Sequence, residues 1–138
     1  MPILDEPIVI TITGDTYTYL SWKEGEGYVP EKGTFGPEYA GEFRLRYQSF
    51  RDRTAIQNKL TATFPMGTSS INPRHVDAIL ACLTIEQCKL EKGVPAWFDP
   101  DEKLGTETDE AAVIAVLNKF RDAMNGRKKA SAATSPSS

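Results

Sequence analysis

A segment in the second half of the chain carries apolar side chains on two opposite sides of the helix that it predicts. Asn72 is a favourable N-cap residue, Pro73 is favoured at the first helical position, and Gly93 can end the helix in a left-handed conformation. At roughly 100° per residue, two apolar faces result. One face holds Val76, Ile79, Leu80, Leu83 and Leu90, and the opposite face holds Ala78, Ala81, Cys82, Ile85 and Cys88.

Such a helix has two explanations. Either it is the central helix of the fold and is packed on both faces, or its second face meets another protein chain. The small side chains of Ala78 and Ala81 would let a partner helix approach closely. On the second explanation, Ala78, Ala81 and Ile85 are candidate partner-binding residues.

The first half of the chain predicts β-structure. Residues 7–13 and 16–22 are rich in β-branched and aromatic residues, and Gly14-Asp15 between them predicts a hairpin turn. Residues 42–47 alternate, which places Phe43, Leu45 and Tyr47 on one face of a half-buried antiparallel strand. We therefore expect a small antiparallel sheet in this half.

Two further helices are expected beside the central one. The first runs over residues 53–63, is capped by Ser49 or Asp52, and ends before Pro65. The second begins after Thr106 or Thr108 and ends at Gly126. Its apolar stripe consists of Val113, Val116, Leu117, Phe120 and Met124. The sequence thus predicts an α+β fold, with the sheet of the N-terminal half packed against about three C-terminal helices.

The chain of 138 residues is long enough for one domain. We place this domain at residues 1–126. Half of the ten glycines lie within residues 23–41, which predicts a long Gly-rich loop there. Residues 127–138 are basic and then Ala/Ser/Thr/Pro only, which predicts a disordered polar tail.

Two aromatic residues lie in a proline-bracketed segment after the central helix. Trp97 and Phe98 stand between Pro95 and Pro100, and exposed aromatic residues of this kind are typical anchors at interfaces. Alternatively, Trp97 fills the gap between the last two helices. Of the two, we expect Phe98 to be the more exposed, and both are candidate partner-binding residues.

The charged and nucleophilic residues form no catalytic or metal-binding pattern. His75 is the single histidine, and Cys82 and Cys88 lie about 240° apart around their helix, so neither a zinc site nor a Cys–His pair is expected. The acidic clusters, such as Glu107 and Asp109, suit a helix N-terminus. We therefore predict no enzymatic activity, no cofactor and no metal.

Charge and hydropathy limit the kinds of partner. The net charge of −3 argues against a nucleic-acid binder, because phosphate contacts require a concentrated positive field. No apolar run reaches the roughly 18 residues that span a bilayer, and residues 1–14 do not resemble a signal peptide. We expect a cytoplasmic protein whose partners are other proteins.

The order of these parts resembles the tail assembly chaperones of long-tailed bacteriophages. The resemblance covers about residues 42–126 and rests on three features: an acidic chain of this length, a Pro-x-Trp segment at Pro95-Ala96-Trp97, and an acidic-capped last helix over residues 109–124. Residues 23–41 have no counterpart in the family pattern.

The resemblance implies a non-enzymatic protein of the host cell cytoplasm that is absent from the mature virion. It implies binding to the helical tape measure protein, contact with the tail tube protein, and self-association. It also implies that a longer product can arise by frameshifting near the end of the reading frame. The alternative is a structural subunit of the tail or of the head–tail connector.

Overall fold

A computed structural model describes residues 6–102 and 104–134, with side chains up to residue 128. This part forms three helices, two antiparallel strand pairs and one 3-10 turn, so the predicted α+β class is confirmed. In chain order the elements are β1 (Ile8–Ile10), β2 (Thr16–Lys23), β3 (Gly27–Thr34), the 3-10 turn (Pro37–Tyr39), β4 (Phe43–Leu45), α1 (Phe50–Thr63), α2 (Pro73–Cys88) and α3 (Glu107–Thr134).

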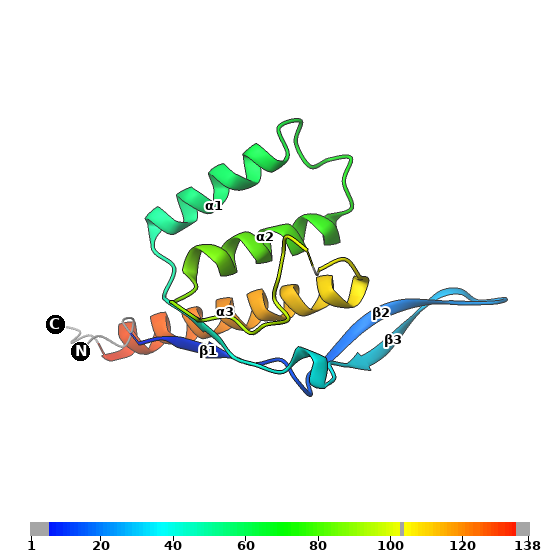
Figure 1. Ribbon diagram of the computed structural model, residues 1–138, viewed down its shortest axis with the longest axis horizontal. Helices are drawn as coiled ribbons and strands as arrows, with labels where there is room; N and C mark the ends of the chain where they lie inside the picture. Colours follow the sequence, from blue (N-terminus) through cyan, green and yellow to red (C-terminus); the bar gives the residue numbers. More distant parts are fainter. Residues whose placement is uncertain (1–5, 103, 135–138) are drawn as a thin grey trace.

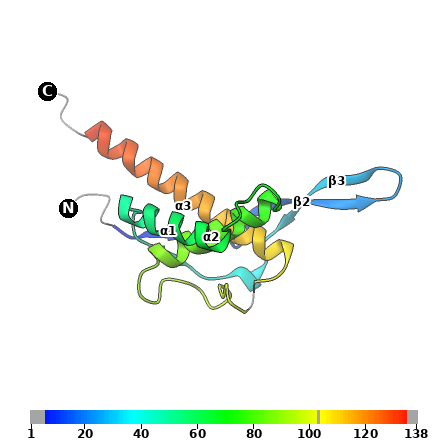
Figure 2. The same cartoon turned by 90° about the horizontal axis from the view of Figure 1, so that it is seen from above.

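The three helices and the β1–β4 pair form a layered body. α2 lies between α1 and α3, and β1 runs along the side of α3 that faces away from α2 (Figure 1). The β2–β3 pair is a long hairpin that leaves this body and projects beyond it (Figures 1 and 2). The molecule therefore consists of a packed body and one projecting arm.

The predicted hairpin between the first two strands is wrong. β1 pairs instead with β4, which sets Ile8 opposite Leu45 and Ile10 opposite Phe43. All four side chains are buried, because register in a half-buried sheet follows the matching of apolar faces. Every residue of β2 is exposed or half-buried, so β2 offers β1 no apolar face to match.

The predicted Gly-rich loop over residues 23–41 is also wrong, because β3 occupies the middle of it. Gly25 and Gly27 have φ values of 83° and 77° and form the turn of the hairpin. Gly33 lies opposite Tyr17, and a Cβ on Gly33 would lie 2.7 Å from the Tyr17 ring. The glycines thus serve a tight turn and a close aromatic contact within a hairpin.

α1 begins earlier than predicted because the two candidate caps act together. The Asp52 N–H donates to Ser49 Oγ at 3.1 Å, and the Ser49 N–H donates to Asp52 Oδ2 at 2.9 Å. This reciprocal pair is a capping box, with Ser49 as the N-cap. The helix therefore starts at Phe50.

α2 has the predicted cap and proline but ends earlier than predicted, at Cys88. The left-handed residue is Lys92, with φ 57°, instead of Gly93. Gly93 is required for a different reason: a Cβ there would lie 2.5 Å from the Arg44 carbonyl oxygen. The Arg44 N–H donates to the Gly93 carbonyl at 2.7 Å, which fixes the segment after α2 against β4.

α3 extends beyond its predicted end. Its cap is as expected, since the Asp109 N–H donates to Thr106 Oγ1 at 3.0 Å, and every residue of the predicted apolar stripe is buried. The helix continues past Gly126 to Thr134, so the predicted disordered tail is wrong over residues 127–134. Alanine, lysine and arginine in this stretch favour helix, and one glycine costs only about 1 kcal/mol. The remainder of the predicted tail, 135–138, lies outside the described residues.

Candidate functional site

The three candidate partner-binding residues of α2 are part of the protein's own core. Ala78 is buried, and Ala81 and Ile85 are completely buried. They share one apolar cluster with α3 residues such as Val113 and Phe120. Their prediction as an exposed partner-binding face is therefore wrong, because the small side chains admit α3 of the same chain.

The aromatic pair after α2 also packs inward. Phe98 is buried and lies edge-to-face against Phe43, with ring centroids 5.6 Å apart. Trp97 is half-buried and contacts Tyr39 and Phe43 at centroid distances of 5.1 and 5.4 Å. The expectation that Phe98 is the more exposed of the two is wrong. Trp97 fills space between β4 and the 3-10 turn, instead of between two helices.

The opposite side of α2 faces α1, which covers it only in part. Val76, Ile79 and Leu83 are each half-buried and follow one another at helical spacing. We call these three residues the α2 outer face. The sequence shows that α2 is apolar on two sides. α2 is the middle helix of the three, with the side of Ala78, Ala81 and Ile85 buried and the α2 outer face only half-buried.

A shallow depression continues the α2 outer face toward the start of α3. It has a volume of about 240 Å³ and includes Ile79. At its edge, His75 Nδ1 lies 2.8 Å from Glu110 Oε2. Its apolar lining consists of Ala78, Ile79, Cys82, Pro100, Leu104 and Val113. The outer face is therefore a ridge of apolar side chains beside an apolar hollow.

The two thiols are poorly suited to nucleophilic chemistry. Burial raises the pKa of Cys82 to about 12 and that of Cys88 to about 11. Both are free and protonated at neutral pH, whereas nucleophilic attack requires the thiolate. Within the part of the chain that the structure describes, no three His, Cys, Asp or Glu residues are placed to hold a metal ion.

A buried carboxylate ties together β4, α1 and α2. Asp52 accepts from the two terminal guanidinium nitrogens of Arg46, from Nη2 at 2.7 Å, and from Gln87 Nε2 at 3.2 Å. Arg46 also donates to the Gln87 carbonyl at 2.8 Å. Burial opposes ionisation of Asp52, but these bonds and the one from Ser49 outweigh it and hold the pKa of the carboxyl well below its usual range. The cluster fixes α1 at a set position beside α2.

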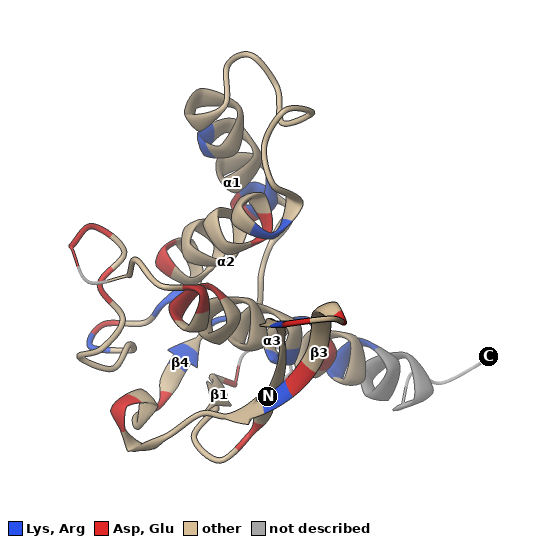
Figure 3. Ribbon diagram, turned by 90° about the vertical axis from the view of Figure 1, so that its right-hand side faces the viewer, with Lys and Arg blue, Asp and Glu red and all other residues tan. Residues whose placement is uncertain are grey.

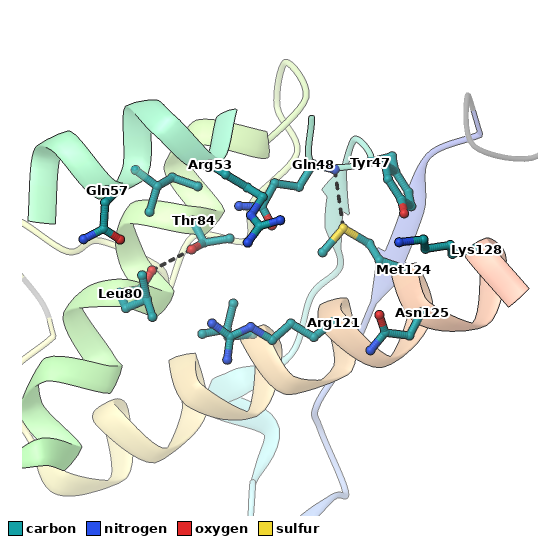
Figure 4. A pocket seen from close by; sticks show the side chains of 12 residues that line it. Tyr47, Gln48, Arg53, Gln57, Leu80, Thr84, Arg121, Met124, Asn125 and Lys128 are labelled. Atoms are coloured by element: carbon teal, nitrogen blue, oxygen red, sulfur yellow. Dashed lines mark hydrogen bonds between the residues drawn. The ribbon is translucent and has the colours of Figure 1, made fainter. Parts of the chain in front are cut away.

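A groove of about 370 Å³ lies between α1, α2 and α3 (Figure 4). We call it the basic groove, because Arg53, Arg121 and Lys128 line it and none of the lining residues is an Asp or a Glu. None of the three cations has a carboxylate within ion-pair distance in residues 6–102 and 104–128. The rest of the lining is apolar or uncharged: Tyr47, Gln48, Ile56, Gln57, Leu80, Thr84, Leu117, Met124 and Asn125.

The hairpin carries an apolar patch that the sequence analysis missed. Register places Leu20 opposite Pro30 and Trp22 opposite Tyr28, so all four lie on one face of the arm. Leu20, Trp22 and Tyr28 are 61%, 66% and 68% exposed. We call these four residues the arm patch. The β-branched and aromatic residues of 16–22 do indicate a strand, but the glycines of residues 23–41 predict a loop where Tyr28 and Pro30 lie.

The described helices include none that is long and apolar enough to cross a membrane. No protein family model matches the chain, and neither a curated protein nor a solved structure matches it significantly.

Proposed function

We propose that this chain is a non-enzymatic tail assembly chaperone of a long-tailed bacteriophage, which binds the tape measure protein before the tail tube polymerises. The observation that carries the proposal is the α2 outer face, a row of half-exposed apolar side chains on the middle helix of the body. The resemblance in the order of sequence elements supplies the identity of the partner.

The geometry of the outer face suits a long amphipathic helix. Val76, Ile79 and Leu83 occupy positions i, i+3 and i+7, the spacing with which one helix presents a ridge to another. The row is a ridge of aliphatic side chains, and the hollow of about 240 Å³ beside it is lined mainly by apolar residues. A surface of this kind accepts many helical sequences, as a chaperone for a long repetitive helix requires.

Co-expression with the tape measure protein of the same phage tests the proposal. We expect Ile79→Asp with Leu83→Asp to abolish co-purification, because two charges would be desolvated in an apolar contact. Phe50→Asp is the matched control, since Phe50 is 84% exposed and lies on α1. Ile85 and Phe98 are unsuitable, because their burial means that a charge there would unfold the protein.

Circular dichroism and urea unfolding show whether the double variant keeps its fold. If it does not, Ile79→Ser with Leu83→Ser makes the same test with less disturbance. Undiminished co-purification of a folded variant contradicts the proposal.

The projecting hairpin favours a second candidate, a structural subunit of the tail or head–tail connector. An exposed arm with an apolar patch is a means by which subunits hold one another in an assembly. Mass spectrometry of purified particles separates the two candidates. A chaperone is missing from the particle, whereas a structural subunit is present at a fixed copy number.

A further inference from the structure

The residues of the arm patch form an exposed apolar group that can anchor the arm to another protein surface. Trp22 and Tyr28 form a cross-strand pair with ring centroids 5.1 Å apart, in an edge-to-face arrangement. Leu20 and Pro30 extend the pair toward the body on the same face. Exposed aromatic residues grouped in this way are characteristic of the centres of protein interfaces.

The tip of the arm is acidic. Glu24 and Glu26 stand exposed in the turn, which faces the viewer in Figure 3. Lys23 is paired with Glu31 at 2.9 Å, so it does not neutralise the turn. Lys32 lies on the patch face but nearer the body. Among the described residues neither Glu24 nor Glu26 has an ion-pair partner, so the anchor ends in two unpaired carboxylates.

The basic groove is complementary to the arm: its cations match the acidic tip, and its apolar lining matches the arm patch. Arg53, Arg121 and Lys128 surround it, and buried Ile56 and Leu117 contribute to its lining. In Figure 4, Arg121 points from α3 into the space beneath α1 and α2. A cavity of about 370 Å³ falls within the range that accepts bulky ligand groups.

The arm cannot reach the groove of its own chain. The groove lies between the start of α1 and the later turns of α3, and the arm projects from the opposite end of the molecule's long axis (Figure 1). Two complementary surfaces at opposite ends of one chain join copies head to tail.

We propose that the arm patch of one copy docks in the basic groove of a second copy, so that the protein self-associates head to tail. This inference does not depend on the chaperone function. Burying Trp22 and Tyr28 removes about 150–250 Å² each, less than the roughly 800 Å² that each partner gives to a standard interface. Each joint is therefore weak, and assembly depends on concentration.

Sedimentation of the full chain over a range of concentrations tests the proposal. Wild type is expected to form larger species as concentration rises. Trp22→Ser with Tyr28→Ser (arm variant) and Arg53→Glu with Arg121→Glu (groove variant) are each expected to stay monomeric. Arg51→Glu is the matched control, because Arg51 has the same charge on the same helix but does not line the groove.

Mixing the two variants gives the sharpest result. The groove variant keeps an intact arm and the arm variant keeps an intact groove, so the mixture is expected to form a 1:1 complex and nothing larger. A monomeric wild type, self-association of the arm variant equal to that of wild type, or an unreactive mixture would each overturn the proposal.

A second readout uses fluorescence. The chain has two tryptophans, so in a Trp97→Phe background only Trp22 emits. Its emission is expected to shift to shorter wavelength as copies associate. If the groove variant self-associates normally but loses the tape measure protein, the groove serves that partner and the self-association model is wrong. If only the α2 outer-face variant loses that partner, the two proposals stand separately.

Discussion

The two strand pairs of this protein are stabilised by different interactions. β1 and β4 pair over only three residues each, but four of the six side chains are buried against the body. β2 and β3 pair over eight residues each, and all of these are exposed or half-buried. The short pair is stabilised by burial and the long pair mainly by its own ladder. An isolated two-stranded hairpin is only marginally stable in water, so length of pairing is a poor guide to strength.

The arm is firmly attached only at its base. Phe35, just after β3, is buried, and the Tyr17 ring stacks on it with centroids 4.5 Å apart. Lys119 of α3 pairs with Asp15 and donates to the Thr11 carbonyl at 2.7 Å. Beyond this base, the arm leaves the body with its apolar patch uncovered.

The largest predicted effect on stability is in the β1–β4 pair. Phe43→Ala removes a completely enclosed ring that contacts both Trp97 and Phe98. We expect a loss of about 3–5 kcal/mol in the free energy of unfolding, measured by urea denaturation. Val9→Ala is the control, because Val9 belongs to the same sheet but faces solvent, and its effect should be within about 0.5 kcal/mol. Equal losses for the two variants would contradict the assigned register.

The next largest effect on stability concerns Asp52, whose carboxylate links the residue after β4, Arg46, to α1 and α2. Asp52→Asn keeps the shape of the side chain but removes the charge that Arg46 and the α1 N-terminus require. We expect a loss of about 2–3 kcal/mol at neutral pH, as for charge-assisted hydrogen bonds. The measurement is urea denaturation of wild type and variant at the same pH.

The pH dependence follows from the lowered pKa of Asp52. In the unfolded chain this carboxyl has a pKa of about 3.9, so its contribution is fully present above that pH. It is lost as pH falls toward the lower pKa of the folded state. Wild type should therefore lose stability below about pH 4, and Asp52→Asn should lose less over the same range.

The residual acid sensitivity of the variant is expected from Asp109. Burial opposes its ionisation, but hydrogen bonds from Tyr39 and from the α3 cap lower its pKa. A parallel pH dependence in the two proteins would mean that Asp52 is not the dominant group.

Local patterns in the sequence predicted the helices and the α+β class, because caps and apolar periodicity act within one element. The alternation that placed Phe43 and Leu45 inward is likewise local, and both are buried. Strand pairing was predicted wrongly, because the choice of β4 as the partner of β1 depends on matching faces some 35 residues apart.

The prediction of the partner-binding residues was wrong for a related reason. The helical periodicity of α2 predicts two apolar faces, but it does not tell which of them α3 covers. Ile85 is predicted to contact a partner, whereas it is completely buried in the core. The cations of the basic groove are far apart in the sequence, because Arg53 lies near the start of α1 and the other two lie in α3. Arg121 and Lys128 join Arg53 only when α1 and α3 both pack against α2 and face one groove.

The smallest predicted effect on global stability is in the arm. Trp22→Thr keeps a good strand former but removes the edge-to-face contact with Tyr28. The urea midpoint of the monomer should be unchanged, because the arm contributes little to the core. Within residues 16–34, amide hydrogen exchange should become faster by about 1.4–5-fold, corresponding to roughly 0.2–1 kcal/mol for a cross-strand pair. Exchange is measured by mass spectrometry at a concentration where the protein is monomeric. Because the arm opens separately from the body, the amides of β1 and β4 should keep the wild-type rate. If they exchange faster by the same factor, the two strand pairs unfold as one unit and the distinction between arm and body is lost.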